Sequence, residues 1–160
     1  MTGTTTNGTI NGTTNGTTSG TNAPLIGRLI YTNVSIHIVN TDNSTDTPLS
    51  VPGTTFGGTA RFSFDGSQVV FCGHSTDNTI NPFKQDQLFV VNADGTNQQR
   101  LTTDTGPGYP VFSPDGKKIA FLTDRDGLGE KTIYTMNVDG TYQTRFGNVT
   151  TGDRSALDWR

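Results

Sequence analysis

Two stretches of the chain are near-copies of each other, and this self-similarity constrains the fold more than any other feature. Residues 61–71 read Arg-Phe-Ser-Phe-Asp-Gly-Ser-Gln-Val-Val-Phe, and residues 111–121 read Val-Phe-Ser-Pro-Asp-Gly-Lys-Lys-Ile-Ala-Phe. A second pair follows at 88–96 and 133–141, where Leu-Phe-Val-Val-Asn-Ala-Asp-Gly-Thr matches Ile-Tyr-Thr-Met-Asn-Val-Asp-Gly-Thr. Such a repeat indicates one supersecondary unit that buries its core by stacking on further copies of itself.

Each repeat is expected to form a four-stranded antiparallel sheet. An Asp-Gly pair between short runs of β-branched and aromatic residues is the strongest local signal for a tight hairpin. No window of 11 or more residues has apolar residues at helical spacing. Four strands in about 45 residues are typical of a β-propeller blade, so the predicted fold class is all-β. The predicted turns are Asp65-Gly66, Asp94-Gly95, Asp115-Gly116 and Asp139-Gly140, and the predicted inward residues are Phe71, Val90, Phe121 and Met136.

The chain holds three blades' worth of strands, offset by one strand. In the first blade, Gly27–Tyr31 and Ile36–Asp42 align with the second, third and fourth strands, so its first strand is missing. At the other end, Trp159 follows Asp139 by 20 residues, as Phe62 follows Asp42 by 20 and Phe112 follows Asp94 by 18. The expected parts are a low-complexity tail at 1–23 and a repeat region at 24–160, with blades at about 24–52, 58–104 and 108–151 and an extra first strand at 155–160.

This offset predicts self-assembly. A blade without its first strand presents an unpaired edge that accepts any strand that fits. Closed propellers have about 4 to 8 blades, so three cannot close a ring alone. We predict that the terminal strand of another copy completes the first blade, giving a filament or a ring; a fragment of a longer chain is the alternative. The predicted assembly residues are Leu29, Ile30, Tyr31, Ala156, Leu157 and Trp159.

Residues 112–127, together with 133–140, closely resemble the WD40-like β-propeller (PD40) repeat of TolB-like proteins. The second unit fits with Phe64 in place of proline, and the first unit fits weakly. In that family, the repeats form six-bladed propellers that bind partner proteins in the periplasm or stand beside the catalytic domain of peptidases. The resemblance therefore implies a fold and a binding or scaffolding role. Three functions remain open: a secreted self-assembling structural protein, a TolB-like periplasmic binding module, and the propeller part of a larger peptidase.

The composition favours a protein that works outside the cytoplasm. Charged residues make up 16% of the chain, below the roughly 25% of ordinary soluble proteins, and 30 of the 160 residues are threonine. The net charge of −3 includes no basic patch, which argues against a nucleic-acid partner. No apolar run of 18 residues predicts membrane insertion. Cys72 is the single cysteine and is expected to be a buried side chain. We predict an extracellular or periplasmic location, with no signal peptide in this numbering.

The tail at residues 2–22 carries no charge and repeats Asn-Gly-Thr with a period of four. It is either a flexible linker or an extended segment that lies along a neighbouring subunit. Asn-x-Ser/Thr triplets make glycans a further candidate partner. The candidate glycosylation sites are Asn7, Asn11, Asn15, Asn33, Asn43 and Asn148.

No pattern in the chain indicates an enzyme. Asp124–Glu130 opens like a calcium loop, but it lacks a third spaced ligand and lies where the repeat needs a turn, so we predict a turn. The loop from His74 to Asp86 is five residues longer than its counterpart; His74, Asp77 and Asp86 could ligate a metal, but a solvated loop is the favoured reading. No nucleophile, base and orienter can be assembled from the sequence, and Gly57-Gly58 precedes no helix that could bind phosphate. We therefore expect no catalytic site, no cofactor and no metal.

Overall fold

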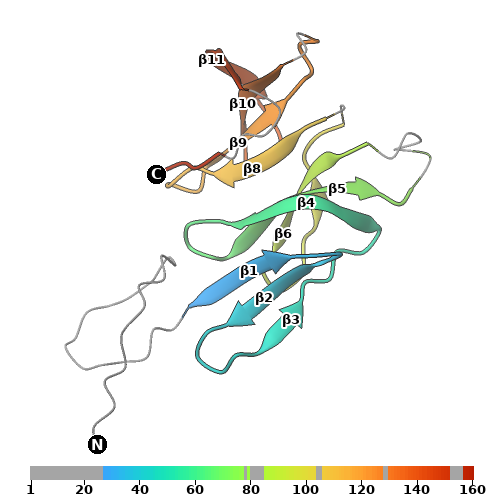
Figure 1. Cartoon of the computed structure of the whole chain (residues 1–160), viewed down its shortest axis with the longest axis vertical. Helices are drawn as coiled ribbons and strands as arrows, with labels where there is room; N and C mark the ends of the chain where they lie inside the picture. Colours follow the sequence, from blue (N-terminus) through green and yellow to red (C-terminus); the bar gives the residue numbers. More distant parts are fainter. Residues whose placement is uncertain (1–26, 78, 80–84, 104–105, 128–129, 152–156) are drawn as a thin grey trace, which may run out of the picture.

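Three antiparallel sheets stack one on another along the long axis of the molecule (Figure 1). The structure, a computed structural model, describes residues 27–77, 79, 85–103, 106–127, 130–151 and 157–160. Every regular element among them is a strand. The predicted all-β blade architecture is therefore confirmed.

Each sheet is one blade of the predicted repeat. Blade 1 comprises β1 (Arg28–Thr32), β2 (Ile36–Asn40) and β3 (Asp46–Pro48), in that order. Blade 2 comprises β4 (Thr54–Phe62), β5 (Gln68–Ser75), β6 (Gln87–Asn92) and β7 (Gln99–Arg100). Blade 3 comprises β8 (Gly108–Phe112), β9 (Lys118–Thr123), β10 (Lys131–Asn137) and β11 (Thr144–Thr151).

The four Asp-Gly turns lie where they were predicted. In each turn the glycine has a positive φ, 72° at Gly66 and 85° at Gly140 for example, which a residue with a Cβ adopts at a cost. The aspartate stabilises the turn through its side chain. Asp139 Oδ1 accepts hydrogen bonds from the Thr141 backbone N–H at 2.9 Å and from the Thr141 hydroxyl at 2.6 Å. These local bonds set the strand register before any core contact is needed.

The core consists of two layers, one between each pair of neighbouring blades. All four side chains predicted to face inward are buried. The layer between blades 1 and 2 contains Ile36, Ile38, Leu49, Ala60, Val69, Phe71, Phe89 and Val91. The layer between blades 2 and 3 contains Val70, Cys72, Leu88, Val90, Leu101, Phe112, Ile119, Phe121 and Met136. Each blade is therefore stabilised by packing against the adjacent blade, as expected of a repeat protein.

Two equivalent glutamines, Gln98 and Gln143, bond to the chain near the start of their own blade or at the end of the blade before it. The Gln98 amide donates to Thr54 Oγ1 at 2.7 Å and to the Pro52 carbonyl at 3.3 Å. One blade later, the Gln143 amide donates to the Leu101 carbonyl at 3.1 Å. Of the two, Gln143 therefore links blade 3 to the residue that follows β7 of blade 2.

The predicted extra first strand at 155–160 is not formed in the part that the structure describes. Residues 157–160 are not in a strand. The physical reason is that the first strand of a blade exists only when it pairs with a second strand, and no such strand lies beside this segment among the described residues. Residues 155 and 156 of this prediction lie outside the described residues.

Candidate functional site

The face of blade 3 turned away from blade 2 is partly uncovered. Val111, Ala120, Ile133 and Phe146 line a hollow there, and Phe146 is 57% exposed. Leu157, Asp158 and Trp159 of the C-terminal segment line the same hollow. Trp159 thus meets the outer face of blade 3, much as Phe112 joins the layer between blades 2 and 3. This placement agrees with the spacing that led us to align Trp159 with Phe112.

A second hollow brings together residues from both ends of the predicted assembly surface. Leu29 and Ile30 of β1 line it, as do Leu157 and Trp159 of the C-terminal segment. The hollow also takes in Arg61–Phe64 and Val111–Pro114, which belong to β4 and β8 and the turns that follow them. Among the described residues, β1 pairs only with β2, so its other edge is unpaired.

The predicted assembly residues of β1 face two ways. Leu29 and Tyr31 are 47% and 42% exposed on the outer face of blade 1. Ile30 packs instead against the layer between blades 1 and 2. Ala156 lies outside the described residues. Whether another copy pairs with this edge remains a prediction.

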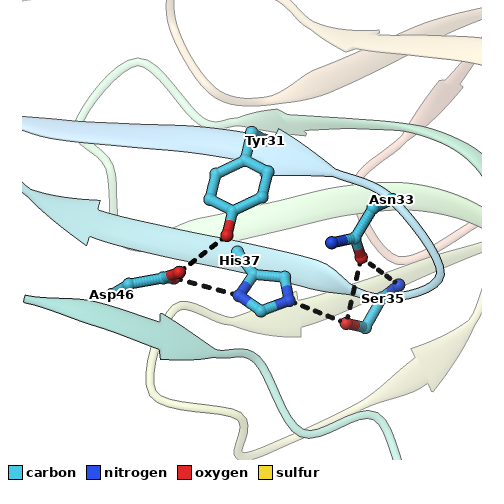
Figure 2. Close-up of polar contacts among 5 residues, drawn as sticks. All are labelled: Tyr31, Asn33, Ser35, His37 and Asp46. Carbon is cyan, nitrogen blue, oxygen red and sulfur yellow. Dashed lines mark hydrogen bonds and ion pairs between the residues drawn. The ribbon is translucent and has the colours of Figure 1, made fainter.

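A polar network crosses all three strands of blade 1 (Figure 2). His37 on β2 lies with its Nδ1 2.9 Å from Asp46 Oδ1 and its Nε2 2.9 Å from the Ser35 hydroxyl. The Tyr31 hydroxyl on β1 donates to Asp46 Oδ2 at 2.6 Å, and its ring stacks on His37 with 4.8 Å between centroids. Asn33 Oδ1 accepts from the Ser35 backbone N–H at 2.9 Å.

From the sequence we found no hydroxyl, histidine and carboxylate that could be arranged as in a catalytic triad, and this network contains such a set. Ser35, His37 and Asp46 form a continuous hydrogen-bonded chain in that order. Sequence reasoning missed it because Asp46 enters only through the pairing of β2 with β3, where Val39 lies opposite Asp46. The signal that could have found it is the Ser-x-His alternation, which places both side chains on one face of a strand.

Hydrogen bonds in this network shift two acid groups in opposite directions. The bonds from Tyr31 and then from His37 lower the pKa of Asp46, because they favour the charged carboxylate. The bond to Asp46 raises the pKa of Tyr31, because the hydroxyl must keep its proton to donate. Both groups are therefore held in the states that keep the three strands together at neutral pH.

The loops that were weighed as metal sites have other roles. Asp126 accepts from the Tyr134 hydroxyl at 2.7 Å and from Thr132 Oγ1 at 3.0 Å, and Arg145 lies 3.5 Å away. The Gly127 N–H donates to the Asp124 carbonyl at 2.8 Å, which confirms the predicted turn. No group of three His, Cys, Asp or Glu residues suited to a metal occurs within the described ranges.

The longer loop of blade 2 is held at its two ends. His74 Nδ1 lies 2.8 Å from Asp86 Oδ1, whereas Asp77 bonds locally to Thr79. Next to them, Cys72 is 4% exposed, as predicted, and burial raises the pKa of its thiol to about 12. The thiol is therefore protonated and unreactive at neutral pH.

Three of the glycosylation candidates lie in the described part of the chain. Asn33 and Asn43 sit in exposed turns, and each Oδ1 accepts the backbone N–H two residues on at 2.9 Å. Asn148 is exposed on β11. Asn7, Asn11 and Asn15 lie outside the described residues, with the whole predicted tail.

Among curated proteins, the chain is similar to TolB proteins. It is 38% identical over 69 residues to the TolB homologue of Chlorobium luteolum, which is 42% of this chain and 15% of that protein. It is 40% identical over 52 residues to the Tol-Pal system protein TolB of Blochmanniella pennsylvanica, 32% of this chain and 12% of that protein. Dipeptidyl-peptidase 5 of Porphyromonas endodontalis is 35% identical over 89 residues, 55% of this chain and 12% of that protein. The chain thus spans 15% or less of the length of these relatives. No family model matches the chain.

Solved structures share the fold. TolB from Acinetobacter baumannii superposes with a TM-score of 0.55 at 21% identity, covering 69% of this chain and 26% of that one. The structure of a TolB from Agrobacterium tumefaciens gives 0.55 at 24% identity, covering 76% of this chain and 44% of that one. The propeller domain of the trilobed protease from Pyrococcus furiosus gives 0.51 at 14% identity, over 74% of this chain and 37% of that one. The repeated motifs, the stacked blades and these similarities agree: the chain is built from β-propeller blades, and its repeats are similar in sequence to those of TolB proteins.

Proposed function

We propose that this chain is a binding module whose propeller blades hold protein partners, and that it works in the periplasm or outside the cell. The sequence similarity to two TolB proteins supports this function better than a purely structural role. Among the described residues, no helix is long and apolar enough to cross a bilayer.

The observation that carries the proposal is the uncovered outer face of blade 3. Phe146 is 57% exposed there, beside an apolar hollow. The matching face of blade 2 is buried against blade 3, with Val70 fully inaccessible and Val90 nearly so. A sheet face of this composition is stable when another protein surface covers it.

Photo-crosslinking at this face tests the proposal. A benzoylphenylalanine at position 146, in cells that export the chain, should form adducts whose fragments contain peptides of other proteins. The same probe at position 142 is the matched control, because Tyr142 is 79% exposed on the neighbouring turn and does not line the hollow. Equal adducts from both positions, or no protein adduct from position 146, would overturn the proposal.

Other copies of the chain are the second candidate partner, in a secreted filament or ring. The unpaired edge of β1 and the position of Trp159 on the outer face of blade 3 favour this reading. In that case, the adducts from position 146 should contain peptides of blade 1 from a second copy. Deleting residues 155–160 should then abolish the oligomer and leave blades 2 and 3 folded.

We also propose that the Ser35–His37–Asp46 chain is structural. The network links β1, β2 and β3, and Tyr31 shares the carboxylate with His37. Ser35 is itself bound through its backbone N–H by Asn33. A fluorophosphonate probe, which labels activated serines, should leave Ser35 unmodified. Labelling that is lost in both Ser35→Ala and His37→Ala would assign a catalytic role instead.

A further inference from the structure

A glycine-lined pocket lies between the inner strands of blades 2 and 3. The register of β4 with β5 shifts between Phe56 and Ala60, and the register of β8 with β9 shifts between Gly108 and Val111. Both irregularities border one cavity of about 250 Å³. Bulges of this kind lift backbone groups out of the ladder and are frequent next to binding sites.

The floor of the pocket is bare backbone. Gly57, Gly58, Gly106 and Gly108 all line it. At Gly57 a Cβ would stand 2.5 Å from Asp86 Oδ1, so a larger residue would displace this carboxylate. At Gly106 the φ of 75° itself favours glycine. Tyr109, also in the lining, has a φ of 54°, which a tyrosine adopts only where the surroundings enforce it.

One carboxylate and one ammonium face this floor. Asp86 lines the pocket, and the 2.8 Å contact with His74 Nδ1 fixes its orientation while using one of its roughly four acceptor positions. Lys131, at the start of β10, also lines the pocket, and its ammonium donates a long hydrogen bond, 3.4 Å, to the Gly106 carbonyl. Cys72 lines the same pocket, and Asp86 raises the pKa of its thiol whereas Lys131 lowers it, so both charges lie near this thiol.

Thr59 also lines the pocket, but its Oγ1 has no accessible surface and is therefore out of reach of a ligand. The groups that a ligand can meet are the Asp86 carboxylate, the Lys131 ammonium and the bare backbone of the glycines.

We propose that this pocket binds a small zwitterion, an α-amino acid, with its ammonium group on Asp86 and its carboxylate on Lys131. A ligand with both charges can meet Asp86 and Lys131 at the same time, which a ligand with one charge cannot do. The volume lies below the roughly 300 Å³ at which pockets for drug-sized ligands begin, so the ligand is small. This inference is independent of the partner-binding role of the blade faces.

Ligand-observed NMR with the full-length chain tests the inference. The probes are glycine, L-alanine and the other protein amino acids, compared with N-acetyl-L-alanine, L-alaninamide, acetate and glucose. We expect saturation transfer to at least one free amino acid, and at least tenfold weaker binding of its acetylated and amidated forms. Acetate that binds as well as the amino acid would indicate an anion site, and an amide that binds equally well would indicate a cation site. Binding of glucose alone would indicate a sugar site. Each of these results would overturn the proposal, as would the absence of saturation transfer to every amino acid.

Two kinds of variant locate the site. Asp86→Asn and Lys131→Met should each weaken binding at least tenfold, whereas Lys117→Met, which removes the same charge at the opposite end of blade 3, should not.

Gly58→Val and Gly108→Val keep both charges and fill the pocket. A Cβ at either position meets no atom within 4 Å, so the fold should tolerate it. Unchanged amino-acid binding in both valine variants, with native circular dichroism, would show that the ligand lies elsewhere.

Discussion

Trp159 and Ala120 line one hollow on the outer face of blade 3, although they come from the C-terminal segment and from β9. Trp159 is the single tryptophan of the chain, so tryptophan fluorescence reports on the surroundings of this residue. The repeat pattern accounts for the position, because Phe112 joins the layer between blades 2 and 3 one repeat earlier.

Replacing Phe146 by serine should shift the tryptophan emission to longer wavelength. Phe146 forms part of the apolar wall of the hollow, and its loss admits water to the indole. The matched control is Tyr142→Ser, which removes an exposed aromatic residue that does not line this hollow and should leave the spectrum unchanged. Identical spectra for the two variants would mean that Trp159 does not lie against blade 3 in solution.

Asp46→Asn should destabilise the chain at neutral pH and have little effect in acid. The pKa of Asp46 is lowered in the folded state, so its contribution is present above its unfolded value and is lost as the pH falls through the folded value. The difference in melting temperature between wild type and variant should therefore shrink as the pH falls below about 4. The control is Asp158→Asn, which changes a carboxylate that is 64% exposed and should leave the melting temperature at neutral pH nearly unchanged. A gap that stays constant with pH would contradict the role of the Tyr31–Asp46–His37 network.

Phe121→Ala should cost about 3–5 kcal/mol in the free energy of unfolding measured with urea. Phe121 is fully buried in the layer between blades 2 and 3, and the smaller side chain leaves a cavity there. Phe64→Ala is the matched control, because Phe64 is 62% exposed and should cost less than about 0.5 kcal/mol. Comparable losses in the two variants would be incompatible with the stacked core.

Asn43 should accept an N-linked glycan when the chain is expressed through a secretory pathway that glycosylates. The residue lies in an exposed turn, where a transferase can reach it. Thr45→Ala removes the acceptor triplet and should lower the intact mass by one glycan, whereas Thr45→Ser keeps the triplet and the glycan. An unmodified mass in the wild type would reject Asn43 as an acceptor.

The sequence predicted what depends on local chemistry. Each Asp-Gly turn combines a side-chain acceptor with a glycine of positive φ, so turn positions and strand register followed from a few adjacent residues. The buried faces followed from the alternation of apolar residues, as at Phe121 and Met136.

What the sequence could not predict depends on register between distant strands. His37 meets Asp46 only because β2 pairs with β3, and Gly57 approaches Asp86 only because β4 is bulged against β5. A strand at 155–160 likewise depends on a partner strand, which the prediction places in another copy of the chain. The pocket lined by Asp86 and Lys131 lies between two blades, so no sequence pattern within a single repeat predicts it.

The mass of the native particle tests the central claim most directly. The chain has a mass of 17.1 kDa, and its outer blade face is proposed to be covered by protein. Native mass spectrometry of the particle, isolated gently from the cells that produce it, should give a mass well above that of one chain. A Phe146→Ser variant should shift the population towards the single chain. A wild-type particle that contains one copy of this chain and no other protein would contradict the account.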